Sequence, residues 1–150
     1  MTIRRIALLG QLTAFVALSA CATGATLSET PAAQAPIPAG KSRIVVYRTN
    51  VMGFAVQPQV TVDSYPTGTC QANGVFFVDV NPGTHRVASS TETTAALQVQ
   101  AQAARPSYVE CSIGMGLAVG RPNLAQVTAD SAAGKIGGLT FTGQFSVPPG

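Results

Sequence analysis

Apolar and polar residues alternate with a period of two along much of the chain after residue 41, as they do in half-buried β-strands. The pattern is clearest at residues 97–102, where aliphatic residues alternate with three glutamines, and it recurs at 109–115. Short apolar or alternating segments predict five further strands, at 43–48, 59–63, 74–80, 84–88 and 123–127. We predict no helix in this part of the chain, and residues 131–139 fit either a last strand or an irregular turn.

Turn-forming residues indicate how these strands connect. Asn81-Pro82-Gly83 separates the strands at 74–80 and 84–88 and predicts a hairpin. The short turn at 103–106 predicts that the strands on either side of it also pair antiparallel. Short strands with frequent turns predict an all-β fold, a small antiparallel β-sandwich of about seven strands over residues 41–140. Residues 141–150 are punctuated by glycine and proline and are predicted to be a frayed tail.

The chain begins with a different pattern, a single apolar run from Ile6 to Ala20 that follows Arg4 and Arg5. A helix of that length rises about 22 Å, whereas a helix that spans a membrane needs roughly 20 residues. The run is therefore predicted to be an export signal, residues 1–20. Leu18-Ser19-Ala20-Cys21 resembles the bacterial lipobox, and the resemblance implies cleavage before Cys21 and acylation of its thiol and new amino group. An ordinary secretory signal with a free Cys21 thiol is the alternative.

The lipobox resemblance also implies a location. In Gram-negative bacteria an aspartate after the modified cysteine commonly retains a lipoprotein in the inner membrane, and here Ala22 follows. We therefore expect an anchor in the outer membrane, on its periplasmic face. Residues 21–40 contain three prolines and no aromatic residue. They are predicted to form a disordered, flexible linker between the lipid and the sandwich.

The charge of the mature chain argues against nucleic acid as a partner. The full sequence carries nine basic and six acidic residues, but Arg4 and Arg5 belong to the predicted signal. The mature chain then has seven basic and six acidic residues, so its net charge is near +1. Proteins that bind nucleic acid present a basic patch, and this part of the sequence contains no basic cluster.

Cys70 and Cys111 are the two cysteines that remain once Cys21 is acylated. The periplasm is oxidising, so a disulfide between them is the first expectation. A bridge closing about 42 residues would stabilise the fold by roughly 4 kcal/mol on the chain-entropy model. Two buried free thiols, or a redox-active or metal-binding pair, are the alternatives, although the chain has no Cys-x-x-Cys spacing.

No set of side chains predicts catalysis or a metal site. His85 is the only histidine, and the sequence supplies neither a nucleophile nor further metal ligands around it. Acidic residues are scattered singly, among them Asp63, Asp79, Glu92, Glu110 and Asp130. We therefore predict no enzyme, no metal and no cofactor apart from the covalent lipid on Cys21.

The order of motifs resembles a known family. Ile44-Val45-Val46-Tyr47-Arg48 is followed by a glycine-containing loop, by Asn73-Gly74-Val75-Phe76-Phe77, and by Val80-Asn81-Pro82-Gly83-Thr84-His85. This order is similar to an uncharacterised family of bacterial lipoprotein domains, domain of unknown function 2846, over roughly residues 41–139. The resemblance implies a β-sandwich at the cell envelope and supplies no activity or catalytic residue.

Two functions compete on these observations. The first is a non-catalytic interaction or structural module of the envelope with a protein partner, for which the loop at 50–57 offers Met52 and Phe54 as contacts; alternatively these two side chains cap the core. The second is a module that binds glycan, peptidoglycan or a small ligand, for which Gln98, Gln100 and Gln102 offer a row of amides. An enzyme is the least supported reading.

Overall fold

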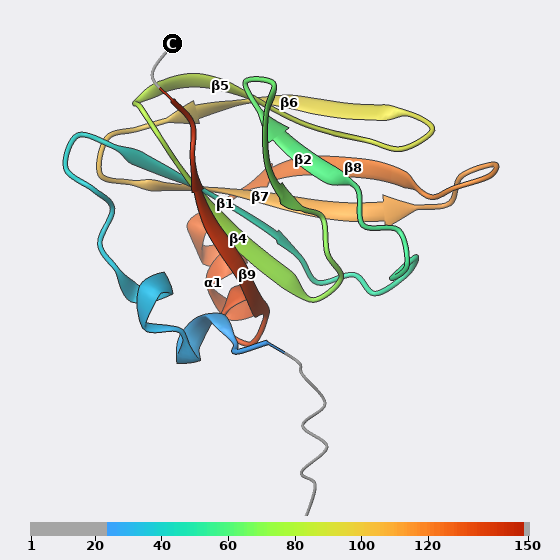
Figure 1. The fold of residues 1–150 in the computed structure, drawn as a ribbon, viewed down its shortest axis with the longest axis horizontal. Helices are drawn as coiled ribbons and strands as arrows, with labels where there is room; N and C mark the ends of the chain where they lie inside the picture. The colour runs from blue at the N-terminus through green and yellow to red at the C-terminus, as the bar shows by residue number, and fades with distance from the viewer. Residues whose placement is uncertain (1–23, 149–150) are drawn as a thin grey trace, which may run out of the picture.

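The computed structural model describes residues 24–148, which fold into two stacked β-sheets (Figure 1). The five-stranded sheet has the order β8 (Arg121–Val127), β7 (Pro106–Gly114), β1 (Ser42–Arg48), β4 (Gly74–Val80) and β9 (Thr140–Ser146). The four-stranded sheet has the order β3 (Tyr65–Thr69), β2 (Gln59–Val62), β5 (Gly83–Ser90) and β6 (Thr94–Ala101). The predicted all-β sandwich is confirmed. Beyond the seven predicted strands, the described residues contain two more, β3 and β9.

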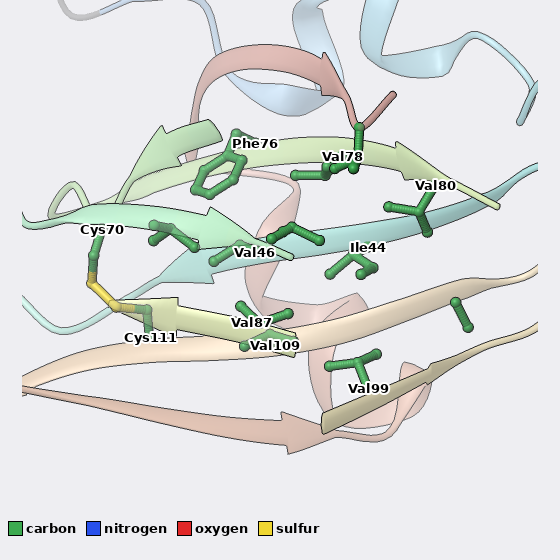
Figure 2. Close-up of a cluster of buried hydrophobic side chains, with 14 of the residues drawn as sticks. Ile44, Val46, Cys70, Phe76, Val78, Val80, Val87, Val99, Val109 and Cys111 are labelled. Carbon is green, nitrogen blue, oxygen red and sulfur yellow. A yellow bond between two sulfur atoms is a disulfide. The ribbon is translucent and has the colours of Figure 1, made fainter. Parts of the chain in front are cut away.

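The main core lies between the two sheets and is built mostly of valine. Alternate residues of β1 and β4 point into it, among them Val46 and Val78, and Val87 and Val99 meet them from the four-stranded sheet (Figure 2). β-Branched side chains favour this arrangement because they pack well on a pleated surface. The period-two pattern of the sequence therefore identified the inward faces correctly.

A second core covers the outer face of the five-stranded sheet, and it corrects two predictions. Residues 21–40 were expected to be a disordered linker, but two short 3-10 helices, η1 (Leu27–Glu29) and η2 (Pro31–Gln34), pack there and bury Leu27. No helix was expected, but α1 (Ala129–Ile136) lies in the 131–139 region and buries Ala132 on the same face. Both segments cover Val45, Tyr47, Val75 and Phe77, which would otherwise face water.

The predicted frayed tail is also wrong. β9 lies parallel to β4, and Phe145 on it contacts Phe76 edge to face, with ring centroids 5.7 Å apart. The segment was misjudged because its residues are only partly buried, so its apolar period is weak. A parallel partner also comes from far along the chain, where no local turn announces it.

Both predicted hairpins are in fact connections between the two sheets. β4 pairs with β1 and β9, whereas β5 pairs with β2 and β6. Likewise β6 belongs to the four-stranded sheet and β7 to the five-stranded sheet. A short turn looks the same in the sequence whether it returns within a sheet or crosses to the other one. Because of these crossings, β1 and β7 run parallel, as do β4 and β9, so the five-stranded sheet is mixed rather than antiparallel.

The predicted signal peptide, residues 1–20, and the predicted lipidation site, Cys21, lie outside the described residues. Within residues 24–148, no helix has the length and apolar character needed to cross a bilayer.

Candidate functional site

Exposed apolar side chains gather in two loops. Between residues 24 and 148, seven large hydrophobic side chains are exposed, and six of them lie in the β1–β2 loop or the β7–β8 loop. We call these six the apolar end: Val51, Met52, Phe54, Met115, Leu117 and Val119. Phe54 is 70% exposed and Leu117 is 92% exposed. Clustered exposure of this kind marks an interaction surface, whereas isolated apolar residues on a surface are ordinary.

The two loops project from the same end of the five-stranded sheet. β1 and β7 are parallel neighbours, and each loop follows directly after its strand. Ile113, near the end of β7, touches both loops, because a Cβ placed on Gly53 or on Gly120 would meet its Cγ2 methyl group. The apolar end is therefore one surface built from two distant parts of the chain.

A buried arginine holds the β1–β2 loop. The side chain of Arg48, the last residue of β1, is fully buried, and its guanidinium donates to five backbone carbonyl groups. The acceptors are Asn50, Met52, Gly53, Val56 and Cys70, at donor–acceptor distances from 2.5 to 2.9 Å for four of them and 3.1 Å for Gly53. Burial lowers the pKa of Arg48 from its ordinary value. Fixing the carbonyl groups inward leaves the Met52 and Phe54 side chains outside.

A glutamate holds the β7–β8 loop by accepting hydrogen bonds from its backbone N–H groups, whereas Arg48 donates to carbonyl groups. The carboxylate of Glu92, in the β5–β6 turn, accepts backbone N–H groups of Leu117 at 2.9 Å, Ala118 at 3.1 Å and Val119 at 3.4 Å. It also pairs with Arg121, at 3.1 Å from Nε to Oε1. The N–H groups of Ala118 and Leu117, and then Arg121, lower the pKa of Glu92 to about 2. Glu92 is therefore ionised when it holds this loop, and the side chain of Leu117 points outward.

The predicted disulfide is confirmed and lies beneath this surface. Cys70 follows β3 and Cys111 lies in β7, so the bond joins the edge of the four-stranded sheet to the five-stranded sheet (Figure 2). Both cysteines are buried in the main core. The carbonyl group of Cys70 is one of the acceptors of Arg48. The bond thus supports the region from which both loops emerge.

Sequence reasoning found two of the six residues of the apolar end. Met52 and Phe54 were candidate contacts, and their exposure rules out the alternative that they cap the core. Met115 and Leu117 were missed, although a signal was present. Residues 52–56 read Met-Gly-Phe-Ala-Val and residues 115–119 read Met-Gly-Leu-Ala-Val. The two copies lie far apart in the sequence, and only the fold brings them together.

The opposite end of the sandwich carries a polar pair. His85 Nδ1 lies 2.6 Å from the carboxylate of Asp63, and its Nε2 lies 2.7 Å from the carbonyl oxygen of Asn81. Burial raises the pKa of Asp63, but hydrogen bonds from His85 and from the N–H of Arg86 outweigh it, and the pKa falls below its ordinary value. The histidine ties two turns together, and both of its ring nitrogens are engaged.

The amide row predicted as a ligand surface borders a shallow pocket. Gln100 and Gln102 line a cavity of about 360 Å³ together with Arg105, Tyr108 and Gln126. Gln98 is not among its lining residues. Across residues 24–148, no three His, Cys, Asp or Glu side chains come close enough to hold a metal ion.

Comparison with known proteins identifies a family. A family model described as "Protein of unknown function (DUF2846)" matches residues 38–122, more than half of the chain. This range runs from just before β1 to the start of β8 and includes both loops of the apolar end. No curated protein and no solved structure matches. The chain belongs to the DUF2846 family.

Proposed function

We propose that this member of the DUF2846 family is a lipoprotein of the outer membrane that faces the periplasm and acts without catalysis, as an interaction module of the cell envelope. The observation that carries the proposal is the apolar end, a preorganised surface of six exposed hydrophobic side chains. Rigid loops bind with less loss of conformational entropy than mobile ones, so a surface held by Arg48 and Glu92 is suited to binding.

Further features support the absence of catalysis in this proposal. A catalytic histidine needs a free ring nitrogen for the nucleophile or substrate proton, but in His85 both nitrogens already have backbone or carboxylate partners. The apolar end, which is the proposed contact surface, also lies at the end of the sandwich opposite to His85.

The anchor is tested by expressing the full chain and a Cys21→Ser variant in a Gram-negative host. We expect the wild-type chain to fractionate with the outer membrane and to carry acyl groups by mass spectrometry. The variant should lose both properties, because the thiol that accepts the lipid is gone. A wild-type chain without acyl groups, or one found only in the soluble fraction, would contradict the proposal.

The interaction is tested with a photo-reactive amino acid at position 54, compared with one at position 65. Tyr65 is also exposed but lies next to the β2–β3 turn, away from the apolar end. In intact cells we expect adducts from position 54 that position 65 does not give. An envelope protein among them would fit the predicted protein partner, whereas no adduct at all from position 54 would remove the main support.

The pocket beside Gln100 favours a second candidate, the binding of glycan or peptidoglycan. Amide, guanidinium and hydroxyl groups surround a half-buried Tyr108, a combination that can bind a sugar through hydrogen bonds and stacking. We expect a Gln100→Ala/Gln126→Ala variant to lose retention on isolated peptidoglycan, and Gln98→Ala to keep it. Equal retention of both variants would exclude this pocket.

A further inference from the structure

We propose that the apolar end dips into the lipid leaflet that holds the acyl chains of Cys21, so that Met52, Phe54, Met115 and Leu117 form a second membrane contact beside the anchor. This inference rests on the proposed lipid anchor. It keeps the proposed anchor and names the bilayer as what these two loops contact, in place of the protein partner expected from the sequence.

The first argument is the point where the chain enters the fold. Thr26 forms a bridge with Thr140, the first residue of β9, and the N–H of Thr140 donates to Asn73 just before β4. The start of β4 faces Arg48, the end of β1. Gly24 therefore enters at the strand ends from which the β1–β2 and β7–β8 loops project. Across five strands this edge is roughly 19 Å wide.

The segment between the lipid on Cys21 and the folded domain is also short. Cys21 precedes Gly24 by three residues, which span at most about 11 Å. The packed helices η1 and η2 take up the segment that was expected to be a long linker. A lipid on Cys21 would then bring this edge of the sheet against the membrane. Figure 1 shows the described chain entering at the lower side and the β1–β2 loop at the lower right.

The second argument is that both loops are prepared for an apolar medium. Neither residues 50–57 nor residues 114–120 include a charged side chain. Backbone polar groups are costly in hydrocarbon unless they are paired within the protein. Arg48 pairs four carbonyl groups of the first loop from inside. Glu92 pairs three N–H groups of the second, and Thr91 donates to the carbonyl group of Gly120 at 2.6 Å.

The third argument is the repeated pentapeptide. Both copies place a methionine and a large apolar residue two positions later on the outside, with a glycine between them. Flexible and apolar side chains of this kind adapt to a fluid surface without needing a complementary shape. Acyl groups on both the thiol and the amino group of Cys21 would already attach the chain stably, so the second apolar contact would chiefly fix the orientation of the domain on the membrane.

Tryptophan gives a direct test, because the chain contains none. The acylated full-length chain, with Phe54→Trp, Leu117→Trp or the control Tyr65→Trp, is reconstituted into phosphatidylethanolamine–phosphatidylglycerol vesicles, with and without brominated acyl tails. We expect the emission of Trp at 54 and at 117 to shift to shorter wavelength and to lose most of its intensity with brominated lipid. The control at 65 should show neither change.

Each other outcome overturns the inference in a recognisable way. Vesicle-bound protein whose three probes are quenched equally little leaves the anchor standing and excludes the second contact. A wavelength shift without quenching by lipid means that a second copy of the chain covers the apolar end. Chain that lacks acyl groups and does not float with vesicles removes the proposed function together with the inference. Titration of free thiols verifies that the Cys70–Cys111 bond has formed in each variant.

Discussion

The two loops of the apolar end carry nearly the same five residues but are held in opposite ways. In the β1–β2 loop a cation, Arg48, reaches the backbone from the buried side and binds carbonyl groups. In the β7–β8 loop an anion, Glu92, reaches across from another turn and binds N–H groups. Either device satisfies the backbone with one side chain, so the apolar side chains are left free to face outward.

The difference between the two devices predicts different vulnerabilities. The Arg48 side chain is enclosed by the fold, so removing it leaves buried carbonyl groups without a donor. Glu92 lies in an exposed turn and stays accessible to protons and salt. The first loop should therefore depend on the stability of the whole domain, and the second on its local charge.

Removing the disulfide tests the support that the two loops share. A Cys70→Ala/Cys111→Ala variant should lose roughly 4 kcal/mol of unfolding free energy on the chain-entropy model, since the bond closes a separation of 41 residues. Urea denaturation followed by circular dichroism measures the loss. We expect the NMR signals of both loops to broaden together. A loss below about 1 kcal/mol would mean that core packing alone holds the sheets together.

Arg48→Met separates the two loops. The variant keeps an apolar side chain of similar length but removes all five hydrogen bonds, and we expect it to cost about 3 kcal/mol of unfolding free energy. Amide hydrogen exchange should accelerate in residues 50–56 more than in 115–120. Arg86→Met is the matched control, because Arg86 is exposed on β5 and should change stability by less than about 0.5 kcal/mol. Equal acceleration in both loops would contradict the independent support of the two loops.

The sequence predicted the faces of the strands well and their neighbours poorly. The alternation in β6 and β7 identified which residues point to the core, because a period of two follows directly from the geometry of a strand. It could not show that these two strands lie in different sheets. Pairing depends on residues far apart in the chain, such as the parallel register of Tyr47 with Glu110, and no local pattern encodes it.

The candidate site was predicted to the same partial extent. Cys70 and Cys111 were paired correctly because the expected oxidising compartment and the two remaining cysteines left one intramolecular bond. The part played by Arg48 was missed, since an arginine at the end of an apolar strand gives no sign that it turns inward. Glu92 was treated as one of several scattered acids. Its partners, Leu117 and Ala118, lie 25 and 26 residues further along the chain.

The smallest predicted effect is the response of the second loop to acid. The pKa of Glu92 is lowered from 4.5 to about 2 in the folded protein, so its contribution to stability is complete above about 4.5 and is lost as the pH falls towards 2. The amide NMR shifts of Leu117 and Ala118 should titrate with a midpoint near 2. Those of Met52 should stay constant over this range, because the guanidinium of Arg48 remains charged in acid.

Carboxylate-to-amide variants assign this titration. Glu92→Gln should abolish it and speed hydrogen exchange in residues 115–120, because a neutral amide binds N–H groups more weakly than a carboxylate does. Asp130→Asn, at an exposed position in the first turn of α1, removes the same charge elsewhere and should leave the titration unchanged. A midpoint near 4.5 for Leu117 would show that the loop does not hold Glu92 as an anion. The contrast between the two loops would then rest on Arg48 alone.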